Sequence, residues 1–184
     1  MSDVTFLGIS GSLRARSFNT ALLRAAKELV PAGVRIEPFS LAEIPIYNED
    51  VRERGFPAVV EALREGIRAA DALLIATPEY NYSIPGVLKN AIDWASRPPQ
   101  QPFDGKPIAL MGASPSMHGS ARAQHHLRQS FIYLNAHILN RPEVMVASAP
   151  SRFDDALKLT DESTRTHIGN LLLSLRDWTL RLRT

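Results

Sequence analysis

Residues whose side chains bind anions crowd the stretch between Val4 and Asn19. An apolar run over 4–9 is followed at once by three hydroxyls, an amide and two guanidinium groups, which belong to Ser10, Ser12, Ser17, Asn19, Arg14 and Arg16. A buried strand that leads through such a loop into a helix forms an anion site in α/β proteins, because free backbone N–H groups and the helix dipole meet there. The stretch therefore predicts a cradle for a terminal phosphate group.

Two familiar phosphate motifs do not fit this loop. Gly8 is followed by Gly11, whereas the dinucleotide fingerprint needs a glycine two positions on, and the loop lacks the Gly-Lys-Ser/Thr ending of a mononucleotide P-loop. An ordinary βα turn, with Ser or Asn capping the helix and both arginines in water, is the alternative. The loop alone does not separate these two interpretations.

Composition limits the class of protein. A chain of 184 residues with 45% hydrophobic and 22% charged residues predicts one globular domain over residues 1–184. The net charge of +2 and the scattered basic residues argue against a nucleic-acid partner. The sequence has no cysteine, so disulfides, thiolate metal sites and cysteine nucleophiles are excluded, and no metal site is expected. With a first strand at Val4 and no long apolar run, we expect no signal peptide, no membrane contact and a cytoplasmic location.

The apolar pattern predicts five strands that alternate with five helices. The strands are expected at 4–9, 34–39, 72–77, 107–113 and 143–146. Helices are expected after the first loop, from Pro57, and over 87–95, 121–134 and 161–183, with 41–55 as a connecting surface loop. Pro38 marks the second strand as an edge strand. These features predict a flavodoxin-like three-layer sandwich around a parallel sheet in the order 2-1-3-4-5.

In that strand order, the loops after strands one, three and four meet at the carboxyl end of the sheet. The second of these loops has Tyr80, Asn81 and Tyr82 between two stiffening prolines, Pro78 and Pro85. Flat apolar faces beside hydrogen-bonding groups suit a flat ligand. A phosphate clamp next to such a platform fits flavin mononucleotide (FMN), whereas a rigid turn with half-buried tyrosines is the plainer interpretation.

The motifs themselves resemble the NADPH-dependent FMN reductases, a family that includes soluble quinone, azo-dye and chromate reductases. The resemblance covers residues 4 to about 134 and rests on Gly11-Ser-Leu-Arg14 with Ser17-x-Asn19, and on Pro78-Glu-Tyr-Asn81 with Ser83-x-Pro-Gly-x-Leu-Lys-Asn-Ala-Ile-Asp-Trp94. The third loop departs from the family pattern, with Ser114-Pro-Ser116 and Gly119-Ser120 in place of Ser-Pro-Gly and a Gly-Gly pair.

The resemblance implies an FMN-dependent NAD(P)H oxidoreductase that assembles as a homodimer or homotetramer and reduces a small-molecule acceptor such as a quinone, azo dye, chromate or free flavin. It implies a cofactor site made of Ser10, Ser12, Arg14, Ser17, Phe18, Asn19, Pro78, Glu79, Tyr80, Asn81, Ser83, Ser114 and Gly119. No catalytic side chain is expected, because bound FMN carries the hydride chemistry and takes NADPH or NADH and then the acceptor on one face. The alternative is an electron-carrier flavodoxin without a substrate of its own, which the slightly basic charge disfavours.

Overall fold

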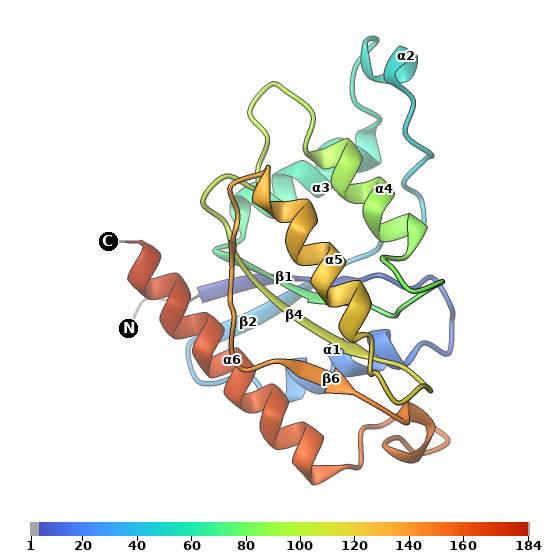
Figure 1. Ribbon diagram of the computed structural model, residues 1–184. Helices are drawn as coiled ribbons and strands as arrows, with labels where there is room; N and C mark the ends of the chain where they lie inside the picture. Colours follow the sequence, from blue (N-terminus) through green and yellow to red (C-terminus); the bar gives the residue numbers. More distant parts are fainter. Residues whose placement is uncertain (1–3, 184) are drawn as a thin grey trace.

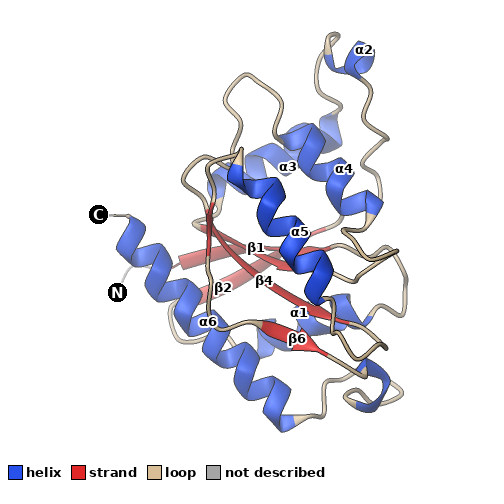
Figure 2. Ribbon diagram, in the orientation of Figure 1, coloured by secondary structure: helices blue, strands red, loops and turns tan. Residues whose placement is uncertain are grey.

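The computed structural model describes residues 4–183 as a sheet with helices on both faces (Figures 1 and 2). The strands are β1 (Val4–Ser10), β2 (Val34–Phe39), β3 (Ala72–Ala76), β4 (Pro107–Ala113), β5 (His137–Ile138) and β6 (Val144–Val146). The helices are α1 (Phe18–Glu28), α2 (Glu49–Arg52), α3 (Ala58–Ala69), α4 (Gly86–Ala95), α5 (Ala121–Ile132) and α6 (Glu162–Leu182), with a 3₁₀ turn at Ala149–Ser151.

All strand pairs are parallel, and the order is β2-β1-β3-β4-β5, so the predicted topology is confirmed. Pro38 lies in β2 opposite Gly8, and among the strands of residues 4–183 β2 pairs with β1 alone, as expected for an edge strand. The sheet's carboxyl ends, and the loops after β1, β3 and β4, lie together on the right of Figure 1.

The last position of the sheet differs from the prediction of a single fifth strand. Two short strands share it: β5 pairs with the start of β4 at Pro107 and Ile108, and β6 pairs with its end from Met111 to Ala113. The chain leaves the sheet between them, at 139–143, where the Arg141–Pro142 peptide is cis. The described part of the chain therefore forms a sheet of six strands, and β6 brings its own backbone next to the loop that follows β4.

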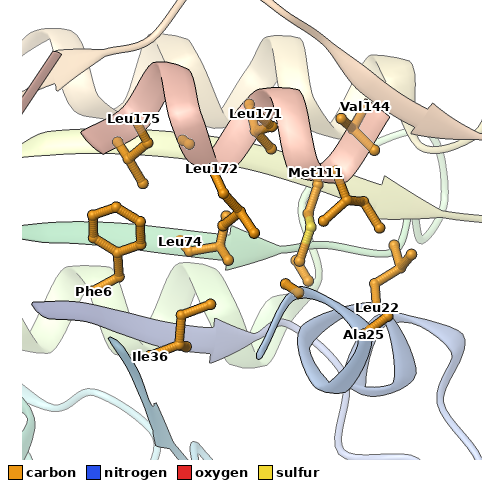
Figure 3. Close-up of a cluster of buried hydrophobic side chains, with 14 of the residues drawn as sticks. Phe6, Leu22, Ala25, Ile36, Leu74, Met111, Val144, Leu171, Leu172 and Leu175 are labelled. Carbon is orange, nitrogen blue, oxygen red and sulfur yellow. The ribbon is translucent and has the colours of Figure 1, made fainter. Parts of the chain in front are cut away.

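Each face of the sheet has its own hydrophobic cluster, because strand side chains alternate between the faces. Phe6, Leu74 and Met111 pack against α1 and α6 on one face (Figure 3). On the opposite face, α3, α4 and α5 pack against the odd-numbered apolar residues of β1 and β3, which are Leu7, Ile9, Leu73 and Ile75. Strands that are buried on both faces explain the uninterrupted apolar runs of the sequence.

One fully buried charge lies in the second cluster's helix layer. Arg64 of α3 is 1% exposed, and its guanidinium donates to the carbonyls of Ala95 at 2.7 Å, Arg97 at 2.8 Å and Pro99 at 2.5 Å. The guanidinium also lies over the Phe56 ring, 4.1 Å from its centroid. The carbonyls at the end of α4 carry the negative end of the helix dipole, so Arg64 joins α3 to the end of α4 and the turn after it.

The segment predicted as a connecting loop, 41–55, has structure of its own. It contains the short helix α2, which stands away from the sheet at the top of Figure 1. The chain before α2 is bound to α4, because Asn90 and Trp94 both donate to the Pro45 carbonyl at 2.8 Å. No helix within residues 4–183 is long and apolar enough to cross a membrane.

Candidate cofactor site

The loop after β1 is shaped by its own hydroxyl groups. Ser17 is the N-cap of α1, since its Oγ accepts from the backbone N–H groups of Asn19 and Thr20. Ser12 Oγ accepts from Arg14 N at 3.3 Å, and Ser10 Oγ is 3.0 Å from the Thr20 hydroxyl. The capping role considered from the sequence therefore applies to Ser17, whose oxygen is directed at backbone N–H groups.

The same loop leaves donors open for an anion. Within residues 4–183, the backbone N–H groups of Leu13, Ala15, Arg16 and Phe18 have no protein acceptor. Phe18 is the first residue of α1, where the helix dipole also favours a negative charge, and the other three residues lie in the loop that leads to it. Arg14 is exposed beside them. This donor set suits a phosphate group, as predicted.

Asn19 has a different role from the predicted contact with phosphate. Its side chain is 3% exposed and forms a ring of two hydrogen bonds with Ala113 at the end of β4: Nδ2 donates to the carbonyl at 3.0 Å, and Oδ1 accepts from the N–H at 2.9 Å. Both polar atoms therefore bind protein backbone. Asn19 joins the first helix to the strand that leads into the third loop.

We expect Asn19→Ala to lower the free energy of unfolding by about 2 to 3 kcal/mol, because the buried N–H and C=O of Ala113 would lose their partners. Urea unfolding at neutral pH measures this loss. Asn140→Ala, on the exposed crossing between β5 and β6, is a matched control and should change the stability by less than about 0.5 kcal/mol. Equal effects of the two substitutions would contradict the role given to Asn19.

The first and second loops are in contact. A Cβ on Gly11 would lie 3.1 Å from Leu88 Cδ2 and 3.3 Å from Pro78 Cδ, so the absence of a side chain lets the backbones approach. The Ser12 hydroxyl is 3.4 Å from the Tyr80 hydroxyl. The phosphate cradle and the aromatic loop are therefore neighbours, as the strand order predicts.

The second loop forms a two-residue hairpin turn. Tyr80 and Ser83 exchange backbone hydrogen bonds at 3.1 and 3.0 Å, and Asn81 and Tyr82 between them have φ values of 47° and 69°. This is the type I′ geometry, in which tyrosine is an unusual occupant. Tyr80 is 49% exposed, which agrees with the half-buried tyrosine of the plainer interpretation, whereas Tyr82 is more exposed, at 63%.

The side chain of Arg122 supports this turn. Its guanidinium lies over the Tyr82 ring, 3.9 Å from the centroid, and forms an ion pair with Glu79. A cation over an aromatic face is attracted by the ring quadrupole. Ser83 is bound in a similar way, since its Oγ is 2.9 Å from Nδ1 of His126. Helix α5 thus contacts the loop at both ends of the hairpin turn.

The resemblance predicts that Glu79 lines the flavin, but its side chain points to α5. Its carboxylate accepts from the backbone N–H groups of Arg122 at 3.0 Å and Ala123 at 3.3 Å, and its side chain is only 6% exposed. Burial acts to raise the pKa of Glu79, but the bonds from Arg122 and from the two backbone N–H groups outweigh it and place the pKa below its ordinary value. Position 79 therefore caps α5, and only its backbone remains free to face a ligand.

The lowered pKa of Glu79 makes the α5 cap dependent on pH. A carboxyl with a depressed folded-state pKa stabilises the protein above its unfolded value, near 4.5, and loses that contribution as the pH falls through the folded value. We expect Glu79→Gln to cost about 1 to 3 kcal/mol at pH 7 and clearly less at about pH 3. Urea unfolding at the two pH values measures the difference. The exposed Glu43→Gln is the control, and a cost for Glu79→Gln that does not change with pH would contradict the cap.

The third loop is fixed against β6 and the turn after it. Ser114 N donates to the Val146 carbonyl at 3.0 Å, and the Ser114 carbonyl accepts from Ala149 N at 3.0 Å. Gly119 has a φ of +53°, and a Cβ there would lie 2.5 Å from the Met145 carbonyl carbon. The departure from the family pattern in this loop therefore leaves a tightly packed backbone, with Met117 79% exposed at its tip.

Phe18 and Arg16 contact a segment late in the chain, at 153–155. The Phe18 ring packs against Phe153, with centroids 5.2 Å apart. Arg16, whose role the sequence left open, donates from Nη2 to the Asp155 carbonyl at 2.8 Å. The segment that contains Phe153 and Asp155 thus closes this side of the first loop. His118 is exposed, and its backbone N–H is 3.4 Å from Ser116 Oγ.

Sequence reasoning missed Arg122 and His126 as parts of the site. The signal was the spacing of four residues on the predicted helix 121–134, which places both on one helix face. Pattern alone does not show that this face meets the second loop, because the angle of the helix on the sheet decides that contact.

A parallel sheet in the order 2-1-3-4-5, with an anion cradle after β1 and an aromatic turn after β3, defines a flavodoxin-like α/β protein. Known proteins narrow this class. The family model for NADPH-dependent FMN reductase matches residues 4–151. An NAD(P)H-dependent FMN reductase of Pseudomonas aeruginosa is 58% identical over 181 residues, which cover 98% of each chain. The quinone reductase of Escherichia coli is 44% identical over 94% of each chain.

A solved structure agrees with these relatives. The flavoenzyme NAD(P)H:(acceptor) oxidoreductase of Paracoccus denitrificans has 32% sequence identity and a TM-score of 0.88, and the match covers 97% of this chain and 98% of that one. The chain belongs to the NADPH-dependent FMN reductase family. The resemblance noted in the sequence is therefore confirmed.

Proposed function

We propose that the protein is an FMN-dependent NAD(P)H oxidoreductase that reduces quinones, or similar acceptors such as azo dyes, chromate and free flavin. The observation that carries the proposal is the contact of the anion cradle with the aromatic turn, through the hydroxyls of Ser12 and Tyr80. A ligand with a phosphate at one end and a flat ring at the other fits this pair of surfaces. The family and the relatives named for FMN and quinone reduction support it.

In this proposal the residues divide into binding and positioning groups. The open N–H groups of the first loop, together with Ser12 and Arg14, bind the phosphate. The second loop provides the surface for the flavin ring, from Pro78, Tyr80 and Asn81. Ser17, Asn19 and Glu79 act as positioning residues that bind protein backbone, and the third loop from Ser114 to Gly119 closes the remaining side. Bound FMN supplies the hydride and electron transfer.

The protein's own side chains need only exclude water and orient the flavin and its substrates, because bound FMN carries out the reaction. The exposed rings of Tyr80 and Tyr82 lie beside the bound flavin in this proposal, and one open face of the flavin takes the nicotinamide donor and then the acceptor. With one such surface, the donor must leave before the acceptor arrives. Steady-state kinetics should then give parallel double-reciprocal lines, and intersecting lines would contradict the shared surface.

An absorbance spectrum and a coupled assay of the purified protein test the proposed function. We expect the flavin absorbance of bound FMN, and oxidation of NADPH or NADH with a quinone in the absence of any other protein. An electron-carrier flavodoxin would show the same spectrum but would need a partner reductase. A colourless protein that does not take up added FMN would overturn the proposal.

Arg14→Ala tests the cradle directly. Loss of a charge-assisted hydrogen bond to phosphate should weaken FMN binding by about 1.5 to 3 kcal/mol, which is about tenfold or more. FMN release measured by fluorescence gives the affinity. Arg54→Ala removes another exposed arginine, close after α2, and should leave FMN affinity unchanged. Unchanged affinity in the Arg14 variant would remove Arg14 from the cradle.

The proposal has three further parts. The chain is one flavin-binding domain, it works in the cytoplasm, and it assembles as a homodimer or homotetramer. Large apolar side chains that remain exposed on α5 support an assembly: Ile132 is 75% and Tyr133 is 92% exposed at its end. Light scattering after size exclusion would report the number of copies. A monomer at micromolar concentration would overturn this part of the proposal alone.

A further inference from the structure

A large cavity adjoins the first loop. It encloses about 570 Å³ between α1, the end of β2 and the chain that follows β2. Its walls are mostly apolar and include Leu13, Leu23, Ile36 and Leu41. This volume and this lining are typical of small-molecule sites, and no role proposed above for FMN uses the cavity's far end.

The charged residues of the cavity all have the same sign. Arg14, Arg24 and Lys27 line it, and none of the described residues in its wall is acidic. Across residues 4–183, none of these three cations forms an ion pair. Thr20, Leu23, Arg24 and Lys27 lie at helical spacing on one face of α1, so the apolar wall and the two outer cations come from one surface. The cavity therefore combines an apolar slot with an unneutralised positive end.

The cavity and the aromatic turn meet at the same residue. Ser12 lines the cavity, and its hydroxyl is 3.4 Å from that of Tyr80. An extended ligand that packs one ring on the flavin held at the aromatic turn can pass Ser12 and Arg14 and reach the cavity with its other end. A dinucleotide has this form, with two ring systems joined by a charged linker.

We infer that the cavity between α1 and β2 binds the adenosine end of NADPH, and that Arg24 and Lys27 bind its 2′-phosphate. This inference rests on the proposed function, because it assigns the second half of the hydride donor. The adenine would pack between the apolar walls at Leu23 and Ile36, and Arg14 would lie near the linking phosphates. NADH has a hydroxyl in place of the 2′-phosphate and cannot use the two outer cations, so the protein should prefer NADPH.

The double variant Arg24→Ala/Lys27→Ala tests the inference on the FMN-loaded protein. Calorimetric titration with adenosine 2′,5′-bisphosphate should show affinity lower by about tenfold or more, because two charge-assisted contacts are removed. Titration with ADP should change little. In assays, the KM for NADPH should rise by a similar factor while the KM for NADH and both kcat values stay near those of the parent.

Two further variants separate a specific site from a general effect of charge. Arg54→Ala/Arg141→Ala removes the same net charge from exposed positions outside the cavity and should leave both titrations unchanged. Ala42→Trp places a bulky ring at the cavity rim without changing charge and should weaken both nucleotides.

Equal binding of adenosine 2′,5′-bisphosphate by the parent and the Arg24/Lys27 variant would overturn the inference. Loss of FMN from that variant would also overturn it, because the cavity would then belong to the flavin. Neither result would affect the proposed function, which depends on flavin absorbance and on NADH or NADPH oxidation by the parent protein.

Discussion

Replacing Gly112 with alanine is expected to lower the free energy of unfolding by more than about 3 kcal/mol and to prevent stable FMN binding. A Cβ on Gly112 would lie 1.9 Å from Ser120 Oγ and 2.3 Å from the Thr77 carbonyl oxygen. The serine side chain is fully buried and the carbonyl belongs to the backbone at the end of β3, so neither atom can move aside cheaply. The added methyl group must push the second and third loops apart, and urea unfolding together with FMN fluorescence would measure both effects.

Gly169→Ala is the matched control for that substitution. Gly169 lies in α6, and a Cβ there meets no atom within 4 Å. Alanine favours the helix over glycine, so this variant should be more stable by up to about 1 kcal/mol and should keep its FMN. If Gly112→Ala behaved like the control, the close approach of the two loops would be contradicted.

Arg64→Ala should have an effect of similar size on stability, with a loss of about 2 to 5 kcal/mol. Truncation removes the donor from three carbonyl groups at the end of α4 and in the turn after it, and leaves a cavity beside Phe56. Arg64→Lys keeps the charge but cannot bind several carbonyls at once, so it should fall between the parent and the alanine variant. The midpoint of urea unfolding is the measurement.

The neighbouring Arg68 provides the control, since it lies one turn further along α3. Its side chain is 29% exposed and pairs with Glu61 and Glu65, so Arg68→Ala should cost less than about 1 kcal/mol. If Arg64→Ala and Arg68→Ala lowered the stability by similar amounts, the buried contacts of Arg64 would contribute no more than the exposed ion pairs of Arg68. The specific joining of α3 to the end of α4 would then be wrong.

The fold followed from the sequence wherever burial was uniform. The strands Ala72–Ala76 and Pro107–Ala113 lie between two layers of helices, and every residue in them is buried. Their uninterrupted apolar sequence therefore predicts central strands. The strand His137–Ile138 was missed because two residues are too few to form any pattern. Arg64 was missed for a different reason. A helix pattern treats arginine as a solvent-facing residue, and only the position of the α4 carbonyls makes its burial favourable.

The location of the candidate site was predictable, but the roles within it were not. Hydroxyl, amide and carboxylate groups that could bind a ligand can equally bind backbone N–H groups, and residue type does not distinguish the two. Ser17, Asn19 and Glu79 all bind backbone here. Ser17 caps its own helix, a local role that the sequence offered as an alternative. For Asn19 and Glu79 the choice depends on distances between segments about 40 to 95 residues apart in the chain, such as Asn19 to Ala113, which only the folded arrangement provides.

The division of the last sheet position between β5 and β6 has a consequence for the behaviour of the protein in concentrated solution. An unbroken outer strand offers a row of free N–H and C=O groups to which another chain can add a strand, and such edges promote aggregation. Here one outer edge consists of two short strands separated by the crossing at 139–143. The opposite edge, β2, carries Pro38 together with the charged Arg35 and Glu37. Neither edge of the sheet therefore presents a long template for pairing with other chains.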